Sequence, residues 1–396
     1  MPDLSEILES ARKLQPELTD LRRRIHAEPE LGLELPETRA KVLEALSDLD
    51  LELELSESTS GIAATLRGAR PGRTILLRAD MDALPLQEDT DLPFKSQREG
   101  AMHACGHDAH TAMLAGAARL LGERRGDLAG NVRFMFQPGE EGHFGARAMV
   151  EEGLLEREPA VDAAFAIHVT PFLSPGWVSA RQGPILASAD VFAVDITGKG
   201  GHASMPHDAV DPIPVACEIV QALQTFVTRR VHAFEPVVLT VTKIEAGTTT
   251  NIIPETAKLL GTLRSVSENS RRRAHEGIRR VASRIAEAHE VEAAVHVVEG
   301  YPPTVNDADF AQFALRVGKE LLGKGRTIEM PFPIMGAEDF SFVLERVPGA
   351  MVFMGMKPDD VAEPAPNHSN RLLLNEDGLA YGAALHAAIA LRYLGD

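Results

Sequence analysis

The chain has 396 residues, 44% of them hydrophobic and 25% charged, the composition of a globular protein in which two domains are expected. Its 40 basic and 58 acidic residues give a formal net charge of −18, which argues against nucleic acid or an anionic membrane as the main partner. No apolar run reaches the ~18 residues of a membrane span, and the polar N-terminus lacks a secretory signal. Cys105 and Cys217, the only cysteines, are too few for a disulfide framework, so we expect a cytoplasmic protein.

Helical spacing of apolar residues predicts helices over residues 4–26 and 36–48. Three short apolar runs follow, with helical patterns over 108–122 and 144–155 between them. This alternation predicts an α/β domain with a mainly parallel sheet, in which ligands gather at the carboxyl ends of the strands. Each run ends in side chains suited to such a site: 74–79 leads to Asp80 and Asp82, 132–136 to Glu140 and Glu141, and 163–167 to His168.

Residues 189–298 change character and follow the order β-α-β-β-α-β, which is the ferredoxin-like pattern. We therefore expect a small domain over 188–299, inserted into a discontinuous domain formed by 1–187 and 300–396. The expected elements of the insert are a strand over 191–196, a helix over 212–228, strands over 237–244 and 256–265, a helix over 271–289 and a strand over 291–298. A long helix over 375–393 is expected to end the chain.

The segment 102–110, with the sequence MHACGHDAH, packs three histidines, a cysteine and an aspartate into nine positions. In an extended segment residues two apart face the same side, so Cys105 and His107 can bind one ion together. A thiolate, an imidazole and nearby carboxylates suit zinc, manganese or cobalt. The alternative is a helix N-terminus capped by Asp108 or His107, with incidental histidines.

Glu140 and Glu141 form the second signal, on a glycine-flanked loop after a buried strand. Adjacent carboxylates on a tight turn diverge, so one can bind a metal while the other acts as general base on a water. The alternative is a solvated acidic turn. Taken alone, His168 reads as a hydrogen-bonded core histidine, and His368 lies in a loop before the last helix and indicates little.

Within the expected insert, the glycine-rich segment 198–206 lacks the Gly-Lys-Ser/Thr ending of a nucleotide-binding loop. Its histidine, His202, is either plain surface or a group delivered to a substrate. Arg264 lies on a predicted strand and is either a solvated outer-face residue or a fork for a substrate carboxylate.

Together these residues resemble the M20 metallopeptidase family, most closely its amidohydrolase branch of N-acyl-L-amino acid amidohydrolases, hippurate hydrolases and indole-acetyl-amino acid hydrolases. The resemblance covers nearly the whole chain in order. The matching segments are 24–31, 78–85, 102–110, 136–142, 200–204, 251–254, 336–340 and 366–369. It implies a zinc-peptidase-like catalytic domain carrying an inserted lid or dimerisation domain.

The same resemblance implies a dinuclear site for two divalent ions per subunit (zinc, manganese, cobalt or nickel). Its ligands would be Cys105, His107, Glu141, His168 and His368. Glu140 would be the general base, and Asp82 a carboxylate that orients a ligand. His202 would polarise the scissile carbonyl from the partner subunit, Asn251 and Arg264 would hold the substrate carboxylate, and Gly336 would line the substrate site. These roles imply a homodimer through the inserted domain, with a dimer of dimers as a larger alternative.

One departure from the wider family concerns Asp80, because many relatives carry His-x-Asp where this chain has Asp80-Met81-Asp82. The resemblance implies that Cys105 and His107 replace the missing histidine ligand. That departure leaves open which ligand binds which ion.

The leading functional hypothesis is hydrolysis of a small-molecule N-acyl amino acid to a carboxylate and a free amino acid. A dipeptidase or carboxypeptidase is the alternative within hydrolases. A third hypothesis makes Cys105 a nucleophile activated by His107, although no Asn or Asp is patterned to orient such a pair. A non-enzymatic binding protein is the fourth, and it leaves the presence of Glu140 and every expected ligand unexplained.

Overall fold

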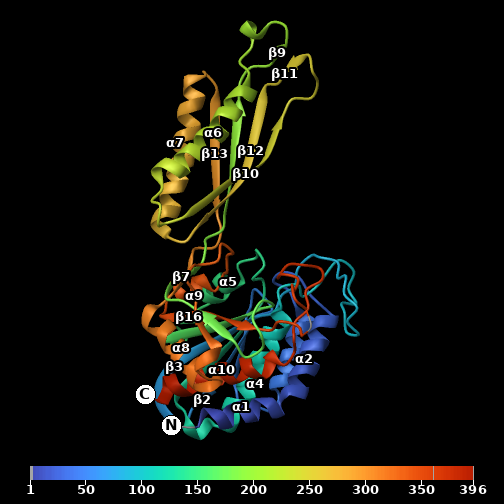
Figure 1. Cartoon of the computed structure of the whole chain (residues 1–396), viewed down its shortest axis with the longest axis vertical. Helices are drawn as coiled ribbons and strands as arrows, with labels where there is room; N and C mark the ends of the chain where they lie inside the picture. Colours follow the sequence, from blue (N-terminus) through green and yellow to red (C-terminus); the bar gives the residue numbers. More distant parts are fainter. Residues whose placement is uncertain (1–2, 360, 396) are drawn as a thin grey trace. The chain divides into compact units, whose positions relative to one another are not determined.

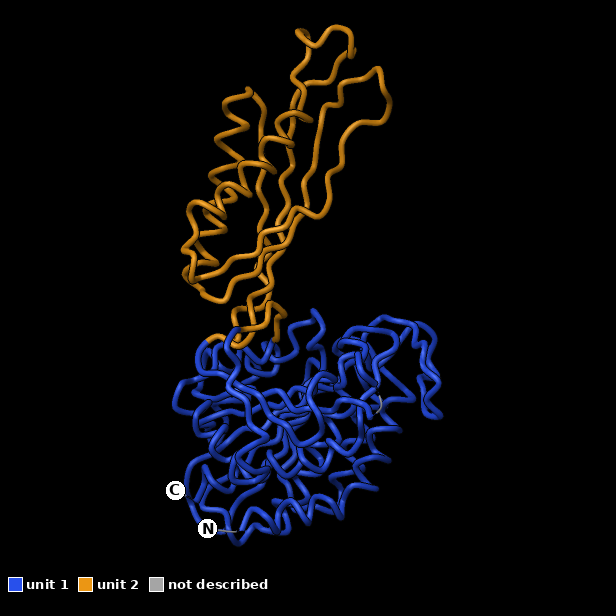
Figure 2. The backbone as a smooth tube through the Cα atoms, in the orientation of Figure 1, with its two compact units in different colours: residues 1–183, 305–332, 339–396 blue, residues 184–304, 333–338 orange. Residues whose placement is uncertain are grey.

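The computed structural model describes residues 3–359 and 361–395, and the chain divides into two compact units (Figure 2). Unit 1 contains residues 1–183, 305–332 and 339–396, and unit 2 contains residues 184–304 and 333–338. Both units bring together segments that are distant in sequence.

Unit 1 is built on an eight-stranded sheet in the order β1-β2-β4-β3-β5-β16-β6-β15 (Figure 1). The pairs β4–β3, β3–β5, β5–β16 and β15–β6 are parallel, whereas β1–β2, β2–β4 and β16–β6 are antiparallel. The strands are β1 (Glu52–Leu55), β2 (Ile62–Arg67), β3 (Arg70–Asp80), β4 (Ala129–Gln137), β5 (Ala163–Thr170), β6 (Val178–Ala180), β15 (Thr327–Glu329) and β16 (Gly349–Gly355). The central strands β3, β4 and β16 are almost wholly buried over their carboxyl-terminal halves, and β5 over its first five residues, as expected of parallel strands covered on both faces.

Helices α4 and α10 pack on the central strands, and α1 and α2 pack over these helices. Nearly every residue of α10 is buried, because this helix is apolar on all sides. The helices of unit 1 are α1 (Leu4–Lys13), α2 (Gln15–Ala27), α3 (Pro36–Leu46), α4 (His107–Glu123), α5 (Gly145–Glu151), α8 (Ala308–Leu322), α9 (Ser341–Leu344) and α10 (Gly378–Gly395), with 3₁₀ turns η1 (Arg125–Asp127) and η3 (Lys324–Arg326).

The single helix expected over 4–26 is wrong, because the chain forms α1 and α2 with a break at Leu14. Pro16 lies in the first turn of α2. Its ring has no N–H to donate and would clash with the preceding turn inside a helix, but it fits a helix start.

Unit 2 has four antiparallel strands in the order β10-β12-β8-β13, with α6 and α7 packed against the sheet. Along the chain the order is β8 (Asp190–Thr197), α6 (Pro212–Arg230), β10 (Val237–Ala246), β12 (Thr256–Ser265), α7 (Glu268–Ala288) and β13 (Glu292–Glu299). This is the ferredoxin-like topology expected from the sequence. A small ribbon of β9 (Gly201–His202) and β11 (Ile252–Ile253) is added to it, beside the turn η2 (Pro206–Asp208). Two more short strands, β7 (Gly183–Leu186) and β14 (Thr304–Asn306), pair with each other.

The α/β class, the mainly parallel large sheet and the ferredoxin-like insert are therefore confirmed. Among the described residues, no helix combines the length and apolar composition that a membrane span needs.

Candidate metal centre

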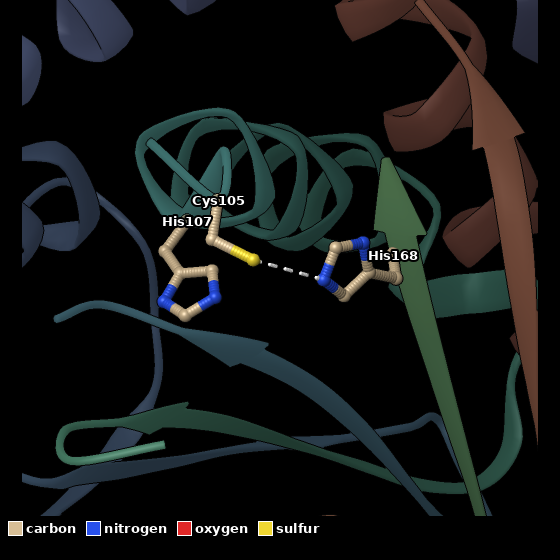
Figure 3. Close-up of side chains that lie close together, drawn as sticks. All are labelled: Cys105, His107 and His168. Carbon is tan, nitrogen blue, oxygen red and sulfur yellow. Dashed lines mark hydrogen bonds between the residues drawn. The ribbon is translucent and has the colours of Figure 1, made fainter. Parts of the chain in front are cut away.

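Cys105 and His107 flank the start of α4, and His168 lies near the carboxyl end of β5 (Figure 3). Their ligand atoms all lie within 4.8 Å of one another, and Cys105 Sγ is 3.4 Å from His168 Nε2. Between the first two ligands, Gly106 adopts φ +91°, and a Cβ there would lie 2.4 Å from Val169 Cγ2. Glycine is therefore required for the chain to turn tightly enough to present both side chains to one space.

The ring orientations of His168 and His107 leave one nitrogen of each ring available to bind a metal ion. His168 Nδ1 is 2.8 Å from its neighbour's carbonyl oxygen at Val169, and His107 Nδ1 is 2.8 Å from the carbonyl oxygen of Asp82. A carbonyl can only accept, so both Nδ1 atoms carry a proton, and in the neutral rings both Nε2 atoms hold a lone pair. His107 Nε2 is buried and has no hydrogen-bond partner among the described residues.

Glu141 and His368 complete the cluster. The ligand atoms of Cys105, Glu141 and His368 lie within 4.8 Å of one another, as do those of His107, Glu140 and Glu141. Glu141 Oε1 is 3.2 Å from His368 Nε2 and 4.0 Å from His107 Nε2. All five predicted ligands therefore face one space in overlapping groups, and Glu140 lies beside them.

The turn that carries Glu140 and Glu141 is fixed by Asp82, two residues after the end of β3. Asp82 Oδ1 accepts the backbone N–H of Glu140 and Oδ2 accepts that of Glu141, each at 3.0 Å. Because Asp82 also supplies the carbonyl that holds His107, one residue orients a ligand and the whole acidic turn.

His368 has φ +67°, a left-handed conformation that costs energy in a residue with a Cβ. Two neighbouring hydrogen bonds hold it there: His368 N–H donates to the Ala104 carbonyl at 2.7 Å, and Asn367 Nδ2 donates to the Cys105 carbonyl at 2.8 Å. Backbone strain at functional positions is common, and here it aims the imidazole at Glu141.

The electrostatics of the cluster favour a bound cation over a free thiolate. Burial raises the pKa of the Cys105 thiol to about 12, so this thiol is protonated at neutral pH until a cation displaces the proton. Burial also lowers the pKa of His168 well below its usual value, which keeps its ring neutral and able to ligate. These shifts disfavour Cys105 as a nucleophile, because a nucleophilic cysteine needs a depressed pKa.

The donor set of one thiol, three imidazoles and adjacent carboxylates, with a buried imidazole nitrogen unpartnered, fits two divalent metal ions. Asp80, His107 and His110 also lie within 4.8 Å of one another. In this further set Asp80 and His110 are already engaged by the protein, because His110 Nδ1 lies 2.5 Å from Asp80 Oδ1 and His110 Nε2 accepts the Val169 N–H at 2.8 Å.

Unit 2 brings two of the remaining candidates together. His202 lies in β9 opposite Ile252, and the carbonyl of Asn251 accepts the N–H of Ala203 at 3.1 Å. His202 Nδ1 accepts the Ser204 N–H at 3.1 Å, so in the neutral ring the proton is on Nε2, and the side chain is exposed. His202 therefore presents an N–H donor to the surroundings.

Arg264 and Gly336 lie elsewhere in unit 2. Arg264 pairs with Val238 near the carboxyl end of β12, whereas the β9–β11 ribbon precedes the amino end of that strand (Figure 1). Gly336 is exposed, and its carbonyl accepts the N–H of Ala187 at 2.8 Å. Unit 2 on its own therefore does not group Arg264 with Asn251.

Several residues of the metal centre were not singled out by the sequence. Asp339 donates its backbone N–H to Glu140 Oε1 at 3.4 Å, and His110 packs on His168 with ring centroids 4.7 Å apart. The signal for His110 was available, because it lies three residues after His107 on the same face of a helix. No sequence pattern placed residue 339 beside residue 140.

Comparison with known proteins agrees with this centre. The sequence profile of peptidase family M20/M25/M40 matches residues 76–392. The chain is 42% identical to an IAA-amino acid hydrolase ILR1-like 4 of Arabidopsis thaliana, over 95% of this chain and 86% of that protein, and 38% identical to thermostable carboxypeptidase 1 of Saccharolobus solfataricus over 99% of each. It also superposes on a crystal structure from Bacillus subtilis described as a dinuclear metal binding peptidase of the M20 family. That superposition has a TM-score of 0.85 and 34% identity, and it covers 97% of this chain and 99% of that one.

Proposed function

The chain belongs to peptidase family M20/M25/M40, and on that premise we propose that it is a metal-dependent amidohydrolase. Its substrates are N-acyl-L-amino acids, such as N-acetyl or N-benzoyl derivatives, which it cleaves to a carboxylate and a free amino acid. The observation that carries this proposal is the placement of Glu140 beside five ligand side chains, on a turn that Asp82 holds.

Two divalent ions held by Cys105, His107, Glu141, His168 and His368 would supply Lewis acidity, polarising the scissile carbonyl and lowering the pKa of water. Glu140 accepts a proton from the attacking water and then delivers it to the leaving nitrogen. The N–H at His202 Nε2 donates to the carbonyl oxygen as negative charge develops on it. The ions are zinc, manganese, cobalt or nickel, which thiolate and imidazole ligands accept.

Arg264 and Asn251 hold the substrate carboxylate in this proposal, and their positions favour a homodimer. Thr256 and Arg264 are eight residues apart on β12, which is roughly 26 Å of extended strand, and Asn251 precedes that strand. One small substrate cannot span this length within unit 2. We therefore assign Arg264 to its own chain's substrate, and Asn251 and His202 to the substrate of a partner joined through residues 188–299.

The proposed enzyme works in the cytoplasm, where its cysteines stay reduced, as a dimer or a dimer of dimers. Gly336 lines the substrate site in this proposal. Hydrolysis of a peptide bond next to a free carboxylate is the second candidate, favoured by the relative named as a carboxypeptidase.

The test is a kinetic screen on protein stripped with a chelator and reloaded separately with zinc, manganese, cobalt or nickel. N-acetyl and N-benzoyl amino acids are compared with dipeptides of the same C-terminal residue. We expect no turnover without metal, and a higher kcat/KM on the N-acyl substrates after reloading. Faster turnover of the dipeptides would favour the peptidase assignment.

A further inference from the structure

Asp80 is a wholly buried carboxylate at the end of β3, two residues before Asp82. Arg78 Nη1 donates to Asp80 Oδ2 at 2.6 Å, and the ring of His110 lies 2.5 Å from Asp80 Oδ1. Both oxygens are therefore already engaged by the protein. Burial opposes ionisation of this carboxyl, but Arg78, His107 and His110 together outweigh burial and hold the pKa of Asp80 well below its usual range.

His110 is the link between Asp80 and the metal ligands. Its Nε2 accepts the N–H of Val169, so Nδ1 carries the proton and donates to Asp80. The ring lies with its centroid 4.7 Å from that of His168, at an interplanar angle of 68°, and 5.4 Å from that of His107. His110 therefore supports one ligand on each side, and it also holds the N–H of the residue that follows His168.

Arg78 ties the same carboxylate to the opposite side of the site. It donates from Nε to Gln137 Oε1 at 2.8 Å and from Nη2 to Asp339 Oδ1 at 3.2 Å. Asp339 in turn accepts the N–H of Ala146 at 2.9 Å. Strand β3, the end of β4 and the start of α5 are therefore joined around Asp80 by a buried network of hydrogen bonds.

We propose that Asp80 is a positioning residue and not a metal ligand: through His110 it fixes the imidazoles of His168 and His107 in the orientation that binds the ions. Asp80 Oδ2 lies 3.5 Å from His107 Nε2, so the carboxylate is near the ligands, but Arg78 occupies that oxygen. Removing a hydrogen-bond partner of a metal ligand typically costs about 10- to 100-fold in metal affinity, and we take this as the range for Asp80, which acts on the ligands through His110. This inference rests on the metal centre of the proposed function.

The test uses cobalt(II) titrated into the chelator-stripped chain, with the affinity of each site measured by chelator competition. Absorption reports the sulfur-to-cobalt band and the coordination geometry. For Asp80→Asn, which keeps the size of the side chain, we expect both ions at saturation. One ion should bind about 10- to 100-fold more weakly, with a shifted cobalt spectrum. His110→Gln should reproduce the effect, and the double variant should be no worse than the weaker single variant.

Asp190→Asn is the matched control, because Asp190 in unit 2 is a buried carboxylate that also binds an arginine and a histidine. Arg271 Nη2 lies 2.6 Å from Asp190 Oδ1, and His275 Nε2 lies 2.9 Å from Asp190 Oδ2. We expect this variant to lose stability without any change in cobalt affinity or spectrum. The inference is overturned if Asp80→Asn loses one ion outright at saturating cobalt, which would make Asp80 a ligand, or if its affinities match those of the control. If the unaltered chain binds no cobalt, the result contradicts the metal centre of the proposed function and not only the role of Asp80.

Discussion

The imidazole of His26 lies with its Nδ1 2.8 Å from Asp108 Oδ2, and both side chains are buried. Burial alone would lower the pKa of His26, but the carboxylates of Asp108 and Glu88 together outweigh burial, and the pKa rises to about 9. A histidine whose pKa is raised by folding stabilises the folded state fully below its unfolded value near 6.5, and that contribution is lost as the pH rises through 9.

We therefore expect the apoprotein to lose up to about 3 kcal/mol of unfolding free energy between pH 6.5 and pH 9 from this pair, at 1.36 kcal/mol per pKa unit. Denaturant unfolding at both pH values measures it. His26→Gln should be less stable at pH 6.5 and should show a smaller decline. Equal declines in both proteins would show that His26 is neutral in the folded state.

Metal affinity should rise steeply with pH, because the Cys105 thiol, with its pKa raised by burial to about 12, must lose its proton when a cation binds. Replacement by Cys105→Asp removes this proton, since a carboxylate is already ionised at neutral pH. Zinc affinity is measured by chelator competition between pH 6 and pH 8. Because the variant releases one proton fewer on binding, we expect its affinity to rise about tenfold less per pH unit than that of the unaltered chain. Retained turnover in the same variant would fit a ligand, and complete loss of turnover with full metal content would favour a nucleophile.

Arg264 is expected to recognise the free carboxylate of the substrate through two parallel hydrogen bonds. No ion pair or hydrogen bond involves its guanidinium among the residues that the structure describes. Arg264→Ala should lower kcat/KM for N-acyl amino acids by about 100-fold, roughly the worth of a charged hydrogen bond, and should affect the corresponding amides much less. Lys258→Ala, on the same strand and paired with Asp195 at 3.0 Å, is the control. Equal losses on acids and amides would remove the proposed role.

Subunit complementation tests whether His202 of one chain acts in the active site of its partner chain. Glu140→Gln and His202→Ala proteins should each be nearly inactive, whereas a mixture after subunit exchange should regain part of the activity. The mixed dimer contains one site with an intact Glu140 and an intact His202 from the neighbour. Native mass spectrometry follows the exchange. If mixed dimers form and no activity returns, His202 does not act across the interface.

The fold class was predictable because both kinds of domain leave periodic patterns in the sequence. The runs before Asp80, Glu140 and His168 indicated strands of a parallel sheet, and their carboxyl ends do meet at one site. The strands β1 and β2 were missed for different reasons. β1 is a short, mostly exposed edge strand, so its apolar signal is weak. β2 is buried but short, and two of its six residues are alanines, which are uncommon in strands.

The metal-binding side chains were predicted from spacing and residue type, but most of the residues that contact and orient them were not. The contact of the Asp339 backbone N–H with Glu140 joins positions 199 residues apart, so no local sequence pattern reveals it. Likewise the separation of Arg264 from the β9–β11 ribbon follows from strand direction and length, which only the folded unit reveals.

In the proposed mechanism the two adjacent glutamates have separate roles: Glu140 moves the proton and Glu141 binds metal. The most direct measurement is metal content per chain together with turnover for Glu140→Gln and Glu141→Gln, each loaded with zinc and freed of excess. We expect Glu140→Gln to keep two ions and to lose about 10²- to 10⁴-fold in kcat, because an amide cannot accept the water's proton. Glu141→Gln should bind fewer than two zinc ions per chain. The reverse pattern, with metal lost from Glu140→Gln and kept by Glu141→Gln, would contradict the assignment.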